Sequence, residues 1–404
     1  MKKIRPIGAS LVVLALAMGT GAIFAGPDPQ IGPASAPRIV KNPKEPVLPP
    51  GQRKKIVFKE ELTIGQAEGG ENYLFEKNIQ CTADEKGAIY VVNWDRKRIQ
   101  KYDAAGKYLL TMGRLGQGPG EFQNIWAPEF DGKGRIYATD IVANRVQFFD
   151  KESGRYADTI KTGLQAGAVF LLPNGMYFSS TMGHPEQAAG SVSYSTVYGI
   201  FDKDFKLRTE LHREKLQMRT PAARSDRAKM LADIMSDTAF KPILYPVVTR
   251  DGRIIIAYPA AYEIKIFGED GAAKLIIRKE DKPKPVTEAH KKHYFETAVM
   301  DFLGDSQNNM AVKDDVRKAM TYPKHLPAYR TCAPMDNGWY FVIEDSTLES
   351  STIDLFDGQG FYIGRFETTI PVGQLVFVNG KAYAVADVDG FKYVKRFGYS
   401  ITEY

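Results

Sequence analysis

One phrase recurs along this 404-residue chain: a short apolar strand, a turn containing glycine, a β-rich strand, a polar hairpin, and an aromatic strand ending in aspartate. The clearest copies run from Asp84 to Asp103 and from Asp131 to Asp150. The glycine of the turn identifies six copies, at Gly87, Gly134, Gly175, Gly252, Gly338 and Gly380. Self-similarity of this kind is the sequence signature of a repeat architecture.

The spacing of these glycines fixes the size of the repeating unit. Successive glycines lie 47, 41, 77, 86 and 42 residues apart, and three intervals match the roughly 40 to 50 residues of a four-stranded propeller blade. The two long intervals then contain insertions of helical composition, at about residues 213–242 and 283–327. The prediction is an all-β chain, a six-bladed β-propeller over residues 53–404 with two mainly helical insertions. A pair of β-sandwiches is the alternative, but it does not explain six equivalent glycines.

The two ends of the predicted propeller contain strand-like segments that could pair and close the ring. After the fifth complete unit only three strand-like segments remain, at 374–378, 381–386 and 391–399. A further strand-like segment, 55–64, precedes the first repeat and has no unit of its own. Pairing this segment with the last unit would complete a sixth sheet and remove its open edge. We therefore expect the N-terminal strand to close the ring.

The first 52 residues differ in composition from the repeats. Residues 1–25 carry Lys2, Lys3 and Arg5, then an apolar run and small residues, which is typical of a secretory signal peptide. A retained membrane anchor is the alternative, because the apolar run approaches the length that spans a bilayer. Residues 26–52 contain eight prolines, which favours a Pro-rich linker. The predicted location is periplasmic or extracellular.

Charge and cysteine content argue against a nucleic-acid-binding protein and against a fold held together by disulfides. Removing residues 1–25 takes away three basic residues and no acidic ones, which lowers the formal net charge from +6 to +3. Without a concentrated basic surface, the chain is not expected to bind nucleic acid. Its two cysteines, Cys81 and Cys332, cannot form a disulfide framework. They occupy the same position in the first and fifth repeats, so we expect two buried free thiols rather than a bridge.

The second repeat and the loop before it resemble the NHL repeat. The resemblance rests on loop, aromatic and hairpin residues, namely Gly118, Pro119, Gly120, Phe122, Trp126, Asp140, Asn144 and Arg145. The glycines permit a tight turn, Phe122 can fill the wedge between neighbouring sheets, and Asp140 can accept hydrogen bonds from the hairpin. The first repeat matches less well, and the other four keep only the pattern. The chain from residue 55 resembles exported bacterial six-bladed propeller proteins, a family named for its fold and without a general activity, so the resemblance implies a fold and not a function.

The innermost strand of each repeat is expected to line the propeller axis, where propeller enzymes usually bind ligands. Aligned on the repeat glycine, these strands present two alternating sets: Thr82, Glu129, Phe170, Val247, Ala333 and Leu375, and Cys81, Pro128, Val169, Pro246, Cys332 and Gln374. Glu129 is the one acidic residue in these sets. It is interpreted as a polar group lining a hydrated channel or as a weak catalytic or ligand-orienting candidate. Because a metal site needs at least three or four ligands, we expect no metal in the channel and no cofactor.

Two of the five histidines form the other weak candidate for a metal site. His290 and His293 lie three residues apart in a segment of helical composition, so one helix face could carry both. No cysteine or third histidine lies near them in the sequence. A solvated helix face is the favoured interpretation of this pair. The remaining three histidines show no pattern typical of a metal or catalytic site.

The two insertions make one face of the propeller the candidate binding face. If both leave from the same face they form a cap over one rim, and loops on a rigid scaffold are where binding concentrates. Trp94 and Trp126 are candidate binding residues together with Glu129, although both tryptophans would also suit packing between sheets. The predicted function is a non-enzymatic, monomeric binding or scaffold protein that recognises a protein, peptide or glycan through one face. The alternative is a hydrolase or lyase acting on a carbohydrate or lactone in the channel, with Glu129 as general base or metal ligand.

Overall fold

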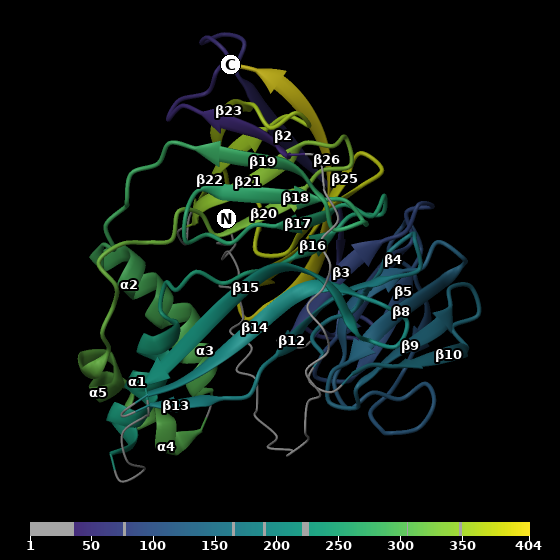
Figure 1. Ribbon diagram of the computed structural model, residues 1–404. Helices are drawn as coiled ribbons and strands as arrows, with labels where there is room; N and C mark the ends of the chain where they lie inside the picture. Colours follow the sequence, from purple (N-terminus) through teal and green to yellow (C-terminus); the bar gives the residue numbers. More distant parts are fainter. Residues whose placement is uncertain are drawn as a thin grey trace.

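The strands of the protein pair into six separate sheets arranged as a ring (Figure 1). In the computed structural model the described residues are 36–404, without 76–77, 164–165, 189–190, 220–225, 305 and 347–349. The predicted six-bladed β-propeller is thereby confirmed. The predicted signal peptide, residues 1–25, and the first part of the predicted linker lie outside the described residues.

Blades 1, 2 and 5 are four-stranded antiparallel sheets made of consecutive strands. Blade 1 contains β3 (Ile79–Ala83), β4 (Ile89–Asn93), β5 (Arg98–Tyr102) and β6 (Tyr108–Met112). Blade 2 contains β7 (Trp126–Phe130), β8 (Arg135–Asp140), β9 (Arg145–Asp150) and β10 (Tyr156–Lys161). Blade 5 contains β20 (Thr331–Pro334), β21 (Tyr340–Ser346), β22 (Ser351–Phe356) and β23 (Tyr362–Thr368).

Blades 3, 4 and 6 depart from this plan. Blade 3 contains β11 (Phe170–Leu171), β12 (Tyr177–Met182), the long pair β14 (Ser191–Phe201) and β15 (Leu207–Arg219), and a short strand β13 (Glu186–Ala188). Blade 4 contains β16 (Val247–Val248), β17 (Ile254–Ile256), β18 (Glu263–Phe267), β19 (Ala273–Lys279) and the N-terminal β1 (Arg38–Asn42). Blade 6 contains β24 (Leu375–Val378), β25 (Lys381–Val388), β26 (Phe391–Glu403) and the N-terminal β2 (Lys54–Ile64).

The six repeat glycines share one backbone conformation. Each lies between the first and second strands of its blade with φ between 69° and 85°, a region that L-residues seldom adopt. At Gly134 an added Cβ would meet no atom within 4 Å. The turn therefore selects glycine for its backbone conformation, which explains why this residue marks every repeat. At Gly252 lack of space adds to this, because an added Cβ would lie 2.8 Å from Pro173 Cδ.

The residues that carry the NHL resemblance hold blades 1 and 2 together. Phe122 is fully buried in the apolar cluster between these blades. The Asp140 carboxylate accepts hydrogen bonds from the backbone N–H groups of Asn124 at 3.0 Å and Ala143 at 3.3 Å, and its ion pair with Arg145 measures 3.4 Å. The structural roles predicted for Phe122 and Asp140 are confirmed.

Ring closure by the N-terminal strand is also confirmed. Strand β2 pairs antiparallel with β26, from Lys54 opposite Glu403 to Ile64 opposite Val394. It thereby forms the outer strand of blade 6, whose other three strands come from the C-terminal end of the chain. The first and last parts of the propeller are thus held by a shared sheet, which leaves no unpaired edge on β26.

The structure corrects the predicted Pro-rich linker, residues 26–52, in the part of it that is described, residues 36–52. Strand β1 pairs in parallel with β19 as the outermost strand of blade 4. Asn42, which is 2% exposed, donates from Nδ2 to the carbonyls of Arg278 at 3.1 Å and Gly360 at 2.9 Å, and its Oδ1 accepts from the Tyr362 N–H at 2.8 Å. The segment from β1 to β2 is therefore a strap along blades 4, 5 and 6. Sequence reasoning missed this strap because a single parallel strand among prolines has no periodicity of its own.

The two insertions meet and form one helical cap, defined here as the helices within residues 227–238 and 288–319. It contains α1 (Arg227–Thr238), α2 (Glu288–Tyr294), the π-helix η1 (Phe295–Val299), α3 (Met300–Leu303), α4 (Gln307–Met310) and α5 (Lys313–Ala319), with blade 4 inserted between α1 and α2. Both insertions connect the last strand of one blade to the first strand of the next, so they leave the same face of the ring. Their apolar residues share one cluster that includes Met235, Phe295 and Val316, and the cap lies beside the β14–β15 hairpin (Figure 1). The cap expected from the sequence is therefore present. None of the helices in the described part of the chain is long and apolar enough to cross a bilayer.

Candidate functional site

The central channel is bridged at the end where the repeat glycines lie. Arg250, in the turn between β16 and β17 of blade 4, donates from Nη2 to the carbonyl oxygen of Ala83 in blade 1 at 2.6 Å. Blades 1 and 4 are opposite in a ring of six, so this side chain crosses the axis. Its guanidinium also lies 5.6 Å from the ring centre of Phe130 in blade 2. One arginine thus connects three blades.

Glu129 lies on β7 close to this bridge, opposite Tyr137 in the sheet. Burial raises the pKa of its carboxyl to about 7, and the positive charge of Arg250 partly offsets that rise. No residue in the described part of the chain forms a hydrogen bond or ion pair with this carboxyl. A carboxyl with a pKa near neutrality can act as either acid or base, but the catalytic and binding roles of Glu129 stay predictions.

Trp94 and Trp126 lie against each other. Their ring centres are 4.6 Å apart with planes tilted by 40°, and Trp94 also packs on the apolar cluster between blades 1 and 2. The Trp94 Nε1 is buried without a hydrogen-bond partner. This mutual contact accounts for both residues as packing residues, and a binding role for either stays a prediction.

His290 connects the cap to blade 5. Its Nδ1 accepts from the backbone N–H of Thr287 at 3.1 Å and so completes a capping box at the start of α2, while its Nε2 lies 3.5 Å from the carboxylate of Asp345. Both ring nitrogens are thus engaged. His293, on the same helix, has a buried Nδ1 without a hydrogen-bond partner. Within the described ranges no group of three or more His, Cys, Asp or Glu residues is placed to hold a metal ion.

The two cysteines are buried and unpaired, as expected. Burial raises the pKa of each thiol, Cys81 and Cys332, to about 12. A thiol that stays protonated at neutral pH is a poor nucleophile and a poor metal ligand. Both cysteines therefore belong to the apolar packing between blades.

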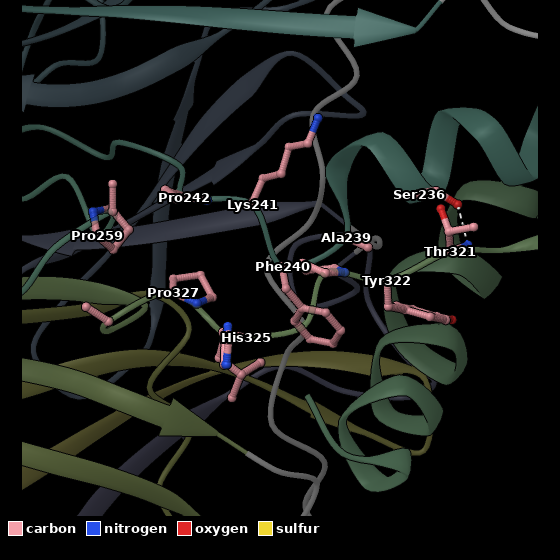
Figure 2. A pocket seen from close by; sticks show the side chains of 14 residues that line it. Ser236, Ala239, Phe240, Lys241, Pro242, Pro259, Thr321, Tyr322, His325 and Pro327 are labelled. Carbon is pink, nitrogen blue, oxygen red and sulfur yellow. Dashed lines mark hydrogen bonds between the residues drawn. The ribbon is translucent and has the colours of Figure 1, made fainter. Parts of the chain in front are cut away.

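A pocket of about 390 Å³ lies where the cap meets blade 4 (Figure 2). Three stretches of chain line it: the end of α1 and the residues after it, the turn between β17 and β18, and the segment that returns from the cap to blade 5. The lining residues are Ser236, Ala239, Phe240, Lys241, Pro242, Pro259, Ala260, Thr321, Tyr322, Pro323, His325, Leu326, Pro327 and Ala328.

Nine of the fourteen residues that line the pocket are apolar, and five carry polar side chains, namely Ser236, Lys241, Thr321, Tyr322 and His325. Phe240 packs on the cap, with its ring centre 5.2 Å from that of Tyr294 and 6.1 Å from that of Tyr322. The Thr321 N–H donates to Ser236 Oγ at 2.9 Å, which ties the two insertions together at the pocket wall. Lys241, Tyr322 and His325 are the ionisable residues of the lining. Such a combination is typical of a site that holds an apolar group and orients it through a few polar contacts.

Sequence reasoning did not single out any residue of this pocket. Four of its lining residues are prolines, at 242, 259, 323 and 327, and three of these stand at the ends of the insertions. Because a helix usually ends before a proline, the prolines indicated where the helices of the insertions end. They did not indicate that the stretches would converge, since 60 to 80 residues separate the first two stretches from the third.

These features define the class of protein: a six-bladed β-propeller with an NHL-type repeat and a helical cap on one face. Residues 71–271 match the model of a family described as 6-bladed beta-propeller. NHL repeat-containing protein 3 of Mus musculus is 30% identical over 122 residues, which cover 28% of this chain and 35% of that protein. The chain thus matches about a third of the length of this relative. The predicted NHL resemblance is confirmed.

Among solved structures, the protein is similar to a chain from Bacteroides fragilis NCTC 9343 that is described as exported. The TM-score is 0.53 and the sequence identity 12%, over 90% of this chain and 100% of the other. At this identity the similarity shows a shared fold and carries no function with it.

Proposed function

We propose that this protein is an exported, non-enzymatic binding protein that recognises a peptide segment of another protein through its capped face. The observation that carries the proposal is the pocket between the cap and blade 4. It lies on the face from which both insertions leave, and both insertions contribute to its walls. Pockets at the junction of two packed units, built on a rigid ring, are common places for ligands.

The lining of the pocket favours a peptide over a glycan. Proline, phenylalanine, tyrosine and leucine side chains present apolar and aromatic surface, which suits an apolar or proline-containing peptide side chain. Lys241 and His325 add hydrogen-bond donors at the wall, which suit a backbone carbonyl or an acidic side chain. A glycan would depend on the five polar side chains of the lining for its hydroxyl groups, and these are outnumbered by nine apolar residues.

A peptide library displayed on phage and selected against the folded full chain tests the proposal. We expect the selected sequences to share an apolar or proline residue. We also expect a variant with a filled pocket, Ala260→Trp, to weaken their binding by about tenfold or more, because the indole would occupy the space of the ligand. Fluorescence anisotropy of labelled peptides measures the affinity.

Ala105→Trp provides the matched control, because Ala105 is an exposed alanine in a turn of blade 1 and lies far from the pocket in the sequence and in the ring. It should leave peptide binding unchanged, and thermal unfolding should show that both variants are folded. Selected peptides that bind Ala260→Trp as tightly as the unmodified protein would overturn the proposal.

One observation favours a second candidate, a hydrolase or lyase that acts on a carbohydrate or lactone in the channel. The carboxyl of Glu129 has a pKa of about 7, a suitable value for a general base. A panel of lactones and glycans incubated with the protein tests this candidate. Product formation that disappears in Glu129→Gln supports it, and product formation that is insensitive to that substitution removes Glu129 from the mechanism.

A further inference from the structure

The segment that returns from the cap to blade 5 forms one side of a small β-ladder. Pro285 and His325 lie opposite each other in an isolated antiparallel bridge. The hydrogen bonds of the bridge are made by the flanking residues, from the Val286 N–H to the Lys324 carbonyl at 3.0 Å and from the Leu326 N–H to the Lys284 carbonyl at 2.9 Å. One edge of the returning segment is therefore paired with residues 284–286.

The backbone of His325 faces the other edge of this segment. Residues opposite each other in an antiparallel pair either exchange both of their backbone hydrogen bonds or exchange none. Because the neighbours of His325 make the bonds of the bridge, its own N–H and C=O point away from residues 284–286. Within the described ranges neither of these two groups has a hydrogen-bond partner. His325 is exposed, so both groups are accessible to a ligand.

The pocket between the cap and blade 4 lies along this free edge. Its lining includes side chains from both faces of the returning segment, namely Tyr322, Pro323, His325, Leu326 and Pro327 (Figure 2). Side chains on the two faces of a strand point in opposite directions, so a cavity that both faces border lies at the edge of the strand. Of the described residues that line the pocket, none belongs to the paired stretch 284–286. The free N–H and C=O of His325 are therefore directed towards the pocket.

The free edge is short and offers a single donor. Two hydrogen bonds close its ends, from the Thr321 N–H to Ser236 Oγ at 2.9 Å and from the Ala328 N–H to the Pro259 carbonyl at 3.0 Å. Between these ends the backbones of Pro323, His325 and Pro327 face the pocket, since strand residues alternate. Proline has no N–H, so only His325 can donate. A partner strand is thereby restricted to one register, which limits indiscriminate pairing at an open edge.

We propose that the pocket binds its peptide as an extended strand that pairs with the free edge at His325. A peptide N–H donates to the His325 carbonyl, and the His325 N–H donates to a peptide carbonyl. The carbonyls of Pro323 and Pro327 accept from peptide N–H groups two residues to either side. Adding a strand to an open edge is a recurrent mode of peptide recognition, in which main-chain bonds give affinity and side-chain pockets give specificity. The inference rests on the proposed peptide-binding function and specifies the conformation of the peptide in that site.

Pairing of this kind restricts where a ligand can carry proline. The N–H groups of an extended peptide point alternately towards the edge at His325 and away from it. Proline cannot donate, so it fits only where the N–H would point away. We expect the peptides selected on the folded chain to contain proline at these alternate positions and not at the positions between them.

An N-methyl scan of a selected peptide tests the pairing. Each peptide N–H is replaced in turn by an N-methyl group, and fluorescence anisotropy measures the affinity for the full chain. We expect the amides that donate to the edge to lose about tenfold or more in affinity on methylation, and the amides between them less than about twofold. Ester replacement of the same amides removes the donor without adding a methyl group, and it should reproduce the alternation.

Variants of the protein test the same hydrogen bonds from the other side. His325→Pro removes the N–H and should weaken peptide binding by about tenfold, whereas His325→Ala keeps the N–H and should weaken it less. Lys324→Pro is the matched control, because the backbone of Lys324 faces the paired edge and its side chain does not line the pocket. It should bind peptide as the unmodified protein does, and thermal unfolding should show that all three variants are folded.

The outcomes separate this inference from the proposed function. If Ala260→Trp weakens the binding of a peptide but methylation weakens it at every amide or at none, the extended pairing is wrong and the proposed function stands. Equal affinities of folded His325→Pro and His325→Ala lead to the same conclusion. If Ala260→Trp leaves the binding of the selected peptides unchanged, the proposed function fails and the pairing fails with it.

Discussion

Arg250 of blade 4 and Ala83 of blade 1 are joined across the propeller axis by a hydrogen bond of 2.6 Å from the guanidinium to the backbone carbonyl. The contact links two blades that share no sheet and no interface. It also places a positive charge beside Glu129. The end of the channel that carries the repeat glycines is therefore a packed junction of three blades, and ligand binding is expected at the opposite, capped face.

Replacing Arg250 should loosen this junction. Arg250→Ala leaves the Ala83 carbonyl without its donor and removes the contact with Phe130, so we expect the free energy of unfolding to fall by about 1–2 kcal/mol. Denaturant unfolding measures the change. Arg155→Ala, at an exposed arginine of blade 2, is the control and should change stability by less than about 0.5 kcal/mol. Equal effects of the two substitutions would show that the bridge is not stabilising.

Glu129 should make stability depend on pH. Its pKa is about 7 in the folded protein, against an ordinary value of 4.5, so the folded state holds a proton that the unfolded state has lost. The stabilisation is full below pH 4.5 and is lost as the pH rises towards and through 7, by up to about 3 kcal/mol. Glu129→Gln should remove this dependence and be the more stable form at pH 8.

Unfolding curves between pH 4 and pH 8 check this expectation. Glu280→Gln, at an exposed glutamate, is the control and should keep the slope of the unmodified protein. If Glu129→Gln retains the full loss of stability between the two ends of this range, the slope comes from other groups.

Asn42 should anchor the strap to blades 4 and 5. Its side chain satisfies two carbonyls and one N–H in a buried position. Asn42→Ala leaves these groups unpaired, so we expect a loss of about 2–4 kcal/mol and faster proteolysis within residues 36–52. Lys41→Ala, at the exposed neighbour in the same strand, should have little effect on either measurement. Unaltered proteolysis in Asn42→Ala would contradict the role of the strap.

Asp354 should be the most sensitive residue of the interface between blades 4 and 5. Its buried carboxylate accepts from Tyr262 at 2.6 Å, Tyr362 at 2.7 Å, Lys279 at 2.7 Å and Arg365 at 2.9 Å. Asp354→Ala leaves two cations without this partner, and we expect a loss of about 3–5 kcal/mol in denaturant unfolding. Tyr262→Phe removes one donor and should cost about 1 kcal/mol. A smaller loss for Asp354→Ala than for Tyr262→Phe would rule out a central role for the carboxylate.

The ring itself was predictable because its information is local and repeated. Each repeat glycine indicates a turn that needs positive φ, and the alternation of apolar residues in each segment predicts a strand. Six copies of this pattern therefore predict six sheets. The strand at 55–64 could be assigned to the last blade because that blade lacked an outer strand. Asn42, by contrast, carries no local pattern, and its partners at Arg278 and Gly360 are more than 200 residues away.

The candidate sites depended on tertiary structure for the same reason. The helical character of both insertions followed from their composition, but no repeat relates one insertion to the other. Only their packing brings Phe240 to Tyr322 at the pocket wall. The sequence by itself determined a closed ring of six sheets, because that ring follows from periodic turns and strands. The tertiary structure decided where a ligand can bind, because those side chains converge through contacts between distant, non-repeated segments.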